Sequence, residues 1–185
     1  MRIVAGEARG ARLKVPAGRE VRPTSDRVRE AIFSSLGQSV RDASVLDLFG
    51  GSGALGLEAM SRGATGAVFV ERSGMIRKIL EANIATLGYQ KSTRVIPGDA
   101  FGALRRLGDE KERFDIVFVD PPYASDLAQR AVEELAASDL MTPLSIIVVE
   151  HKRSQIIHCP KSLQVSTTKR YGDTSITYLR QVEST

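Results

Sequence analysis

The chain has one cysteine, two histidines and no tryptophan among its 185 residues. A single thiol, Cys159, excludes an internal disulfide framework and is typical of a protein in a reducing cytosol. His151 and His158 are the only imidazoles and no Cys-x-x-Cys pair is present, so we expect no metal site. No apolar run reaches the ~18 residues that a membrane-spanning helix needs, and residues 1–14 lack the apolar segment of a secretory signal. These absences predict a cytoplasmic protein without a membrane anchor.

The composition is that of a folded globular protein. Hydrophobic residues make up 42% and charged residues 26% of the chain, which excludes the composition of a disordered protein. A chain of this length buries roughly 70% of the surface of its unfolded form, so it can build a complete core alone. We expect one domain with a small appendage, present as a monomer.

The positive charge is concentrated at the beginning of the chain. The formal net charge is +4, and residues 1–30 carry all of it, with eight cations against four acids. Residues 31–185 hold equal numbers of each sign. A basic segment on a neutral body favours a polyanionic partner such as nucleic acid, although a solvated arm gives the same pattern.

From residue 44 onward, apolar strands and amphipathic helices alternate. We expect strands at 44–49, 67–71, 93–97, 114–119 and 144–150, with helices at 54–62, 74–87, 100–107 and 126–137. Nearly continuous apolar strands indicate a parallel sheet covered on both faces, which is a doubly wound α/β fold. The alternating segments 163–169 and 174–180 predict a C-terminal antiparallel hairpin.

The N-terminal segment has a different pattern. Residues 1–22 contain two short apolar alternations around residues 7–10, which predict a small β-hairpin. Thr24 or Ser25 is expected to cap a helix that ends at Gly37. The sequence therefore divides into a basic N-terminal extension at 1–22 and an α/β domain at 23–185.

A glycine-rich turn follows the first strand of this domain. Gly51, Gly53 and Gly56 form G-x-G-x-x-G between a strand and a helix, and we call residues 50–53 the glycine loop. Glu71 ends the next strand 20 residues after Gly51, where it could accept hydrogen bonds from ribose hydroxyls. This pattern fits a nicotinamide dinucleotide enzyme and a methyltransferase equally well, and a turn required only for packing also remains open.

Two further acids favour a cationic ligand. Asp47 precedes Gly51 by four residues, and its carboxylate would repel a pyrophosphate but attract the ammonium and sulfonium of S-adenosylmethionine (AdoMet). Asp99 follows the third strand and could accept the adenine amino group, cap the next helix, or do both. The carboxyl ends of parallel strands line the ligand crevice of an open α/β sheet, so these acids and Glu71 are expected to meet there.

The most specific motif is Asp120-Pro121-Pro122-Tyr123, directly after the fourth strand. The prolines end the strand and remove two N–H donors, which leaves an acceptor-rich turn suited to an exocyclic amine. Tyr123 offers a ring on which a base can stack, and Asp120 can offset the charge that develops on the amine nitrogen. The motif predicts methyl transfer to a base amine through orientation and electrostatics, without a metal.

Together these motifs resemble the RsmD family of bacterial ribosomal RNA methyltransferases. The matching segments are RPTSDRVREAIF at 22–33, DLFGGSGALGLEA at 47–59, FVE at 69–71, GDA at 98–100, FDIVFVDPPY at 114–123 and YGDT at 171–174. The resemblance implies AdoMet-dependent N2-methylation of one guanine in 16S rRNA within the small (30S) ribosomal subunit. It also implies a Rossmann-like fold with a seven-stranded, mainly parallel sheet.

The resemblance also assigns roles to residues. The implied AdoMet-binding residues are Thr24, Asp47, Phe49, Gly51, Ser52, Gly53, Glu71, Arg72, Asp99 and Ala100. The implied catalytic residues around the target guanine are Asp120, Pro121, Pro122 and Tyr123. The cations expected to contact the rRNA backbone are Arg2, Arg9, Arg12, Lys14, Arg19 and Arg22. Gly50 is one departure, because the family pattern commonly has alanine there.

Other functions remain open at this stage. An adenine-N6 methyltransferase of DNA or RNA can use the same D-P-P-Y motif, although such DNA enzymes normally need a target-recognition region for which this chain has no room. Asp47 and the paired prolines argue against an NAD-dependent enzyme. The complete set of acids argues against a non-catalytic RNA-binding module.

Overall fold

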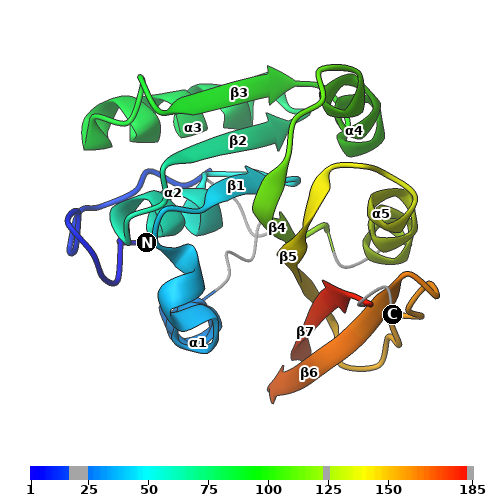
Figure 1. The fold of residues 1–185 in the computed structure, drawn as a ribbon. Helices are drawn as coiled ribbons and strands as arrows, with labels where there is room; N and C mark the ends of the chain where they lie inside the picture. Colours follow the sequence, from blue (N-terminus) through cyan, green and yellow to red (C-terminus); the bar gives the residue numbers. More distant parts are fainter. Residues whose placement is uncertain (17–24, 123–125, 183–185) are drawn as a thin grey trace.

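The computed structural model describes residues 1–16, 25–122 and 126–182, and its centre is a seven-stranded sheet (Figure 1). The strand order is β3-β2-β1-β4-β5-β7-β6. The strands are β1 (Ser44–Asp47), β2 (Gly66–Glu71), β3 (Thr93–Pro97), β4 (Phe114–Val119), β5 (Met141–Lys152), β6 (Leu163–Tyr171) and β7 (Thr174–Gln181).

The sheet is mainly parallel, as the sequence predicts. Strands β3, β2, β1, β4 and β5 pair in parallel, whereas β7 pairs antiparallel with both β5 and β6. It follows that β7 alone among these strands runs in the opposite direction. The chain order reverses between β1 and β4, which are neighbours, and the loops after these two strands enclose the crevice where such sheets bind ligands.

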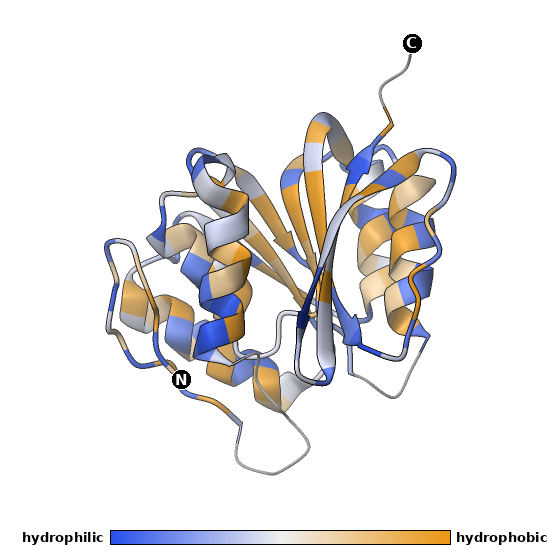
Figure 2. Cartoon of the chain, turned by 90° about the horizontal axis from the view of Figure 1, so that it is seen from below, coloured by the Kyte–Doolittle hydropathy of each residue, from blue (hydrophilic) through white to orange (hydrophobic). Residues whose placement is uncertain are grey.

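Helices cover both faces of the sheet and enclose two cores. The helices are α1 (Asp26–Leu36), α2 (Ala54–Ser61), α3 (Gly74–Leu87), α4 (Ala100–Asp109) and α5 (Leu127–Ala136), with a short 3-10 turn η1 (Gly37–Val40) after α1. Successive strand residues point to opposite faces of the sheet. Val45 therefore lies in the cluster under α1, α2 and α3, which we call the first core, and Leu46 lies in the cluster under α4 and α5, which we call the second core. Figure 2 shows hydrophobic strands between helices whose hydrophilic sides face outward.

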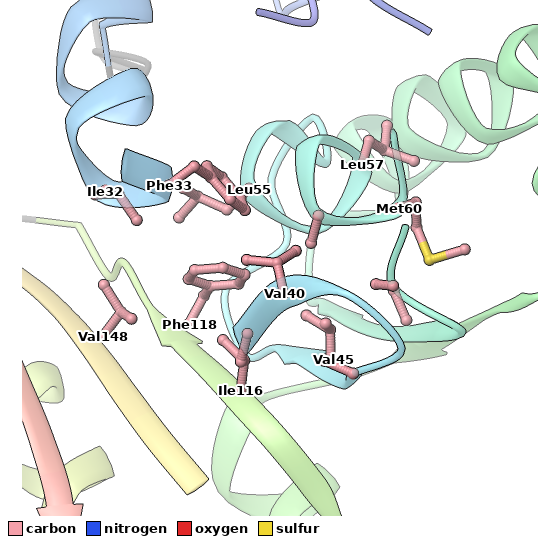
Figure 3. Close-up of a cluster of buried hydrophobic side chains, with 14 of the residues drawn as sticks. Ile32, Phe33, Val40, Val45, Leu55, Leu57, Met60, Ile116, Phe118 and Val148 are labelled. Carbon is pink, nitrogen blue, oxygen red and sulfur yellow. The ribbon is translucent and has the colours of Figure 1, made fainter. Parts of the chain in front are cut away.

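The first core is well packed around aromatic rings. The centroids of Phe33 in α1 and Phe118 in β4 lie 5.7 Å apart, and both side chains are at most 1% exposed. Leu57 from α2 and Val45 from β1 pack around them in the same cluster (Figure 3). This packing fixes α1 and α2 against β1 and β4, the two strands that border the crevice.

Most element boundaries agree with the sequence-based prediction. Helix α3 and strands β3 and β4 have the expected bounds, and Ser25 caps α1 by accepting a hydrogen bond from the Val28 N–H at 3.2 Å. Thr24, the other expected cap, lies outside the described residues. Strand β5 was expected at 144–150 but begins at Met141, which pairs with Phe114 across a register shift.

The described part of the N-terminal segment, residues 1–16, lies against α2 and α3, and we call it the N-terminal arm. The arm doubles back on itself, but the expected pair of strands is reduced to a single antiparallel bridge between Arg2 and Arg12. Ile3 and Leu13 are buried in the first core, so the arm packs as part of the domain. In the part of the chain that the structure describes, no helix has the length and apolarity to cross a bilayer.

Candidate active site

The glycine loop lies at the reversal of strand order, between the ends of β2 and β4. The N–H of Leu48 donates to the Phe118 carbonyl of β4 at 3.0 Å. The N–H of Gly50 donates to the Val70 carbonyl of β2 at 2.8 Å. Because Asp120 directly follows β4, the glycine loop and the Asp-Pro-Pro turn start from adjacent strands.

The three glycines of the motif meet different structural needs. Gly51 and Gly53 have positive φ angles of 52° and 87°, which side chains disfavour. A Cβ at Gly53 would lie 2.6 Å from a methyl carbon of Leu80. At Gly56 a Cβ would lie 2.3 Å from the Phe69 ring, so this glycine lets α2 pack closely on β2. The motif is therefore used for backbone conformation as well as for helix–sheet packing.

Gly50 stands where the family pattern commonly has alanine, and the space around it would admit little more than the methyl group of an alanine. A Cβ would lie 3.3 Å from the Val70 carbonyl oxygen and 3.4 Å from the Phe69 Cβ. These contacts are close, so an alanine requires a shift of a few tenths of an ångström. Gly50 is not among the glycines with a positive φ angle, so the backbone conformation there does not itself require glycine.

Asp47 lies at the end of β1 and is 2% exposed. Its Oδ2 accepts a hydrogen bond from the Gly56 N–H at 3.0 Å, so the carboxylate links β1 to the first turn of α2. Burial raises the pKa of Asp47 to about 7; the Gly56 N–H opposes this shift, and the negative charge of Glu71 adds to it. A cationic ligand at the glycine loop would favour the ionised form of Asp47.

Glu71 holds the glycine loop from the other side. Its Oε2 accepts from the Gly51 N–H at 3.0 Å, and its Oε1 accepts from the Ser73 N–H at 2.6 Å. Glu71 is half-buried at the end of β2, and each carboxylate oxygen has a further lone pair for a ligand. Arg72, the next residue, is exposed.

Asp99 caps α4, one of the two roles expected for it. Its Oδ1 accepts from the N–H groups of Phe101 and Gly102 at 3.1 and 3.0 Å. The Gly102 N–H is the main cause that holds the pKa of this exposed carboxyl below its usual value. Asp99 is therefore ionised at neutral pH. Ala100, the first residue of α4, is buried.

The remaining predicted site residues differ in exposure. Asp120 is half-buried, Pro121 is buried and Pro122 is exposed, whereas Tyr123 lies outside the described residues. Phe49 is partly buried and packs against the second core. Within residues 1–16, 25–122 and 126–182, no group of three or more His, Cys, Asp or Glu side chains is arranged to hold a metal ion.

Four predicted RNA-contacting cations are exposed on the N-terminal arm: Arg2, Arg9, Arg12 and Lys14. Nε of Arg2 also lies 3.6 Å from a carboxylate oxygen of Asp26. Arg19 and Arg22 fall in a part of the chain that the structure leaves undescribed.

Arg29 corrects the interpretation of the charge distribution. It is one of the eight cations of residues 1–30, but it is fully buried and adds nothing to the basic surface. Its Nε lies 3.3 Å from Oε2 of Glu58, which is also fully buried, and its Nη2 lies 2.9 Å from Oδ1 of Asp26. Nη2 of Arg29 also donates to the carbonyl of Arg2.

Two buried polar residues that were not predicted from the sequence, Glu58 and Asn83, hold the N-terminal arm, and Asn83 also contacts the glycine loop. Glu58 in α2 accepts from the N–H groups of Val4 and Ala5 at 2.8 and 2.9 Å. Asn83 in α3 hydrogen-bonds both Lys14 and Ser52. The detectable signal was an asparagine beside the apolar positions Leu80 and Ile84 of an amphipathic helix.

Comparison with known proteins assigns the family. A family model described as "Conserved hypothetical protein 95" matches residues 1–180. The chain belongs to this family. Among its relatives, the RsmD-family protein "Ribosomal RNA small subunit methyltransferase D" of Escherichia coli is 40% identical over 150 residues, 81% of this chain and 74% of that protein. The resemblance to the RsmD family is thereby confirmed.

Other relatives extend over nearly the full length of both chains. "Putative rRNA methyltransferase YlbH" of Bacillus subtilis is 33% identical over 179 residues, 95% of this chain and 96% of that protein. The solved structure "Putative methyltransferase yhhF" of Escherichia coli superposes with a TM-score of 0.87 at 35% identity, covering 98% of this chain and 97% of that one. This RsmD-family chain therefore has the Rossmann-like methyltransferase fold expected from its sequence.

Proposed function

We propose that this protein transfers a methyl group from AdoMet to the exocyclic N2 amine of one guanine in 16S rRNA within the small ribosomal subunit. Membership in the RsmD family and the names of its relatives support an rRNA methyltransferase. The observation that carries the proposal is the placement of the glycine loop and Asp120-Pro121 on adjacent strands at the reversal of strand order. A cofactor on the first and a base on the second would then lie side by side.

The residues around the glycine loop fit AdoMet in charge and hydrogen bonding. Asp47 and Glu71 supply negative charge beside the loop, which suits a ligand with an ammonium and a sulfonium. The further lone pairs of Glu71 suit ribose hydroxyls, and the exposed Asp99 carboxylate suits an adenine amino group. The other residues assigned to this site are Thr24, Phe49, Gly51, Ser52, Gly53, Arg72 and Ala100.

At the other side of the crevice, the chain must orient a weak nucleophile. AdoMet supplies an electrophilic methyl group, and the guanine nitrogen takes it as the carbon–sulfur bond breaks. The lone pair of a base amine is delocalised, so fixing its direction toward the methyl group contributes most of the acceleration. Asp120 accepts an amine N–H and offsets the positive charge that develops on nitrogen before a proton leaves. Pro121 and Pro122 keep this turn rigid and free of competing N–H donors.

One aromatic residue and a set of basic residues complete the proposed substrate site. Tyr123 stacks on the guanine, a contact worth about 1–3 kcal/mol per base. Arg2, Arg9, Arg12 and Lys14, together with Arg19 and Arg22, contact rRNA phosphates. Such contacts position the protein on the subunit without selecting the base.

The test is methyl transfer from labelled AdoMet to unmodified small subunits, naked 16S rRNA and duplex DNA, with the labelled base identified after digestion. We expect N2-methylguanine, with more label in subunits than in naked rRNA. The Asp120→Asn variant serves as the control for site-dependent transfer. Label in adenine, or no transfer to any rRNA acceptor together with no AdoMet binding, would contradict the proposal.

A further inference from the structure

Asn83 connects the N-terminal arm to the glycine loop. It lies on α3 and is 1% exposed. Its Oδ1 accepts from the Lys14 N–H at 2.8 Å, and its Nδ2 donates to the Lys14 carbonyl at 2.9 Å. Nδ2 also donates to the carbonyl of Ser52, in the glycine loop, at 2.9 Å.

The amide group of Asn83 therefore binds main-chain atoms of two separate segments, Lys14 in the N-terminal arm and Ser52 in the glycine loop. Asn83 meets the N–H and the C=O of Lys14 together, as a neighbouring strand would, and so fixes the orientation of the two peptide groups that flank this residue. Both donor hydrogens of the amide are engaged by carbonyls of Lys14 and Ser52. Because the group is buried, a displacement of Lys14 that rotates the amide also leaves the Ser52 carbonyl without its donor.

The other anchors of the arm are separate from the glycine loop. Ser61, 3% exposed near the C-terminal end of α2, donates to the Ala5 carbonyl at 2.6 Å and accepts from the Ala8 N–H at 3.0 Å. Tyr89 donates to Glu7 at 2.9 Å. These contacts hold the first half of the arm, whereas Asn83 holds Lys14 and is itself bonded to Ser52 of the glycine loop.

We propose that Asn83 is a positioning residue through which rRNA bound at the arm and AdoMet bound at the glycine loop strengthen each other's binding. The proposal rests on the proposed function, which places the exposed Lys14 side chain on an rRNA phosphate and AdoMet on the glycine loop. A phosphate on Lys14 restricts the Lys14 main chain, Asn83 transmits that restriction to Ser52, and the cofactor site is ordered before AdoMet arrives. Coupling between two sites is reciprocal, so AdoMet must favour rRNA binding by the same factor.

The experiment measures a complete binding cycle. The dissociation constant of unmodified small subunits is determined without and with saturating S-adenosylhomocysteine, which has no methyl group to transfer. The dissociation constant of S-adenosylhomocysteine is determined without and with subunits. For the natural protein we expect each ligand to tighten the other by about 5-fold or more. For Asn83→Ala we expect a factor near one, with both ligands still bound.

Ser61→Ala is the matched control. It also removes buried hydrogen bonds from the arm, so it should weaken subunit binding, but it leaves the Asn83 contacts in place. We therefore expect its coupling factor to equal that of the natural protein. A lower factor in Ser61→Ala matching that of Asn83→Ala would reduce Asn83 to a general anchor of the arm and overturn the proposal.

A second measurement covers the case in which Asn83→Ala is poorly folded. Amide hydrogen exchange at Lys14 in the natural protein should slow when S-adenosylhomocysteine binds, although Lys14 lies outside the cofactor residues. Unchanged exchange at Lys14, or ligands that bind the natural protein without affecting one another, would overturn the inference alone. Failure of the natural protein to bind S-adenosylhomocysteine or subunits would instead contradict the proposed function, and the inference with it.

Discussion

Replacing Glu58 by glutamine should destabilise the fold severely, because this buried carboxylate has four partners. It accepts from the N–H groups of Val4 and Ala5, and it faces the guanidinium groups of Arg29 and Arg62 at 3.3 and 2.8 Å. Glutamine has the same shape but only one acceptor oxygen, and its amide group would point N–H bonds at a donor. Arg29, which is fully buried, would keep its charge without its buried counter-ion.

The magnitude follows from this geometry. Removing one partner of a buried ion pair costs about 3–5 kcal/mol, because the remaining charge stays away from water. The 2.9 Å contact between Arg29 and the partly exposed Asp26 leaves some compensation, which favours the lower half of that range. A domain of this kind is stable by about 5–15 kcal/mol, so Glu58→Gln should shift the urea midpoint by a large fraction of its value.

Urea unfolding followed by circular dichroism measures this loss. Glu81→Gln is the matched control, because Glu81 forms an exposed ion pair with Arg77 at 3.6 Å within one helix, and such pairs contribute at most about 0.5 kcal/mol. Trypsin should also cut Glu58→Gln faster at Arg9 and Arg12, since one of the N–H groups of Val4 and Ala5 loses its acceptor. A loss below about 1 kcal/mol, or one equal to that of Glu81→Gln, would refute the reasoning about the buried network.

Three further outcomes are expected. Burial raises the pKa of Asp47 from 3.8 to about 7, so between these pH values the folded protein holds a proton that the unfolded chain releases, and this contribution to stability is lost as the pH rises. Asp47→Asn should therefore make the melting temperature depend less on pH in this range. Parallel profiles for the variant and the natural protein would show that Asp47 is not the source of the pH dependence. Gly56→Ala should cost about 1–3 kcal/mol, measured by urea unfolding, because its Cβ would lie 2.3 Å from the Phe69 ring; an unchanged midpoint would show that the ring yields freely. Asp120→Asn should lower methyl transfer to small subunits by about 100-fold or more while AdoMet affinity, measured by calorimetry, stays within about 2-fold; equal losses in both would place Asp120 in the cofactor site.

The sheet was predictable because its signals are local. The apolar runs of β3 and β4 and the amphipathic spacing of α3 are complete within a few residues, and their bounds were predicted correctly. The beginning of β5 was not predicted correctly, because Thr142 and Pro143 are typical of a loop. They belong to the strand because Met141 pairs with Phe114 of β4. A pairing that depends on a distant residue leaves no mark in the local pattern.

The candidate site shows the same division. The glycine loop, its acids and the Asp-Pro-Pro turn were identified from spacing, and the sheet brings them to neighbouring strand ends. Arg29 was counted among the cations of the basic segment because its partner, Glu58, is 29 positions away. Only the folded chain shows that this arginine neutralises a buried acid, and therefore that the exposed charge of the N-terminal segment is smaller than the sequence suggests.

The anchoring of the N-terminal arm has a consequence for how this surface can change. Glu58, Ser61 and Asn83 bind main-chain groups of the N-terminal arm. These hydrogen bonds therefore do not depend on which side chains most of the bound residues carry. The outward side chains at Arg9, Arg12 and Lys14 can be replaced one by one while the segment stays in place. Under the proposed function, the residues that contact rRNA can therefore change during evolution or be redesigned while the main chain of the N-terminal arm keeps its position.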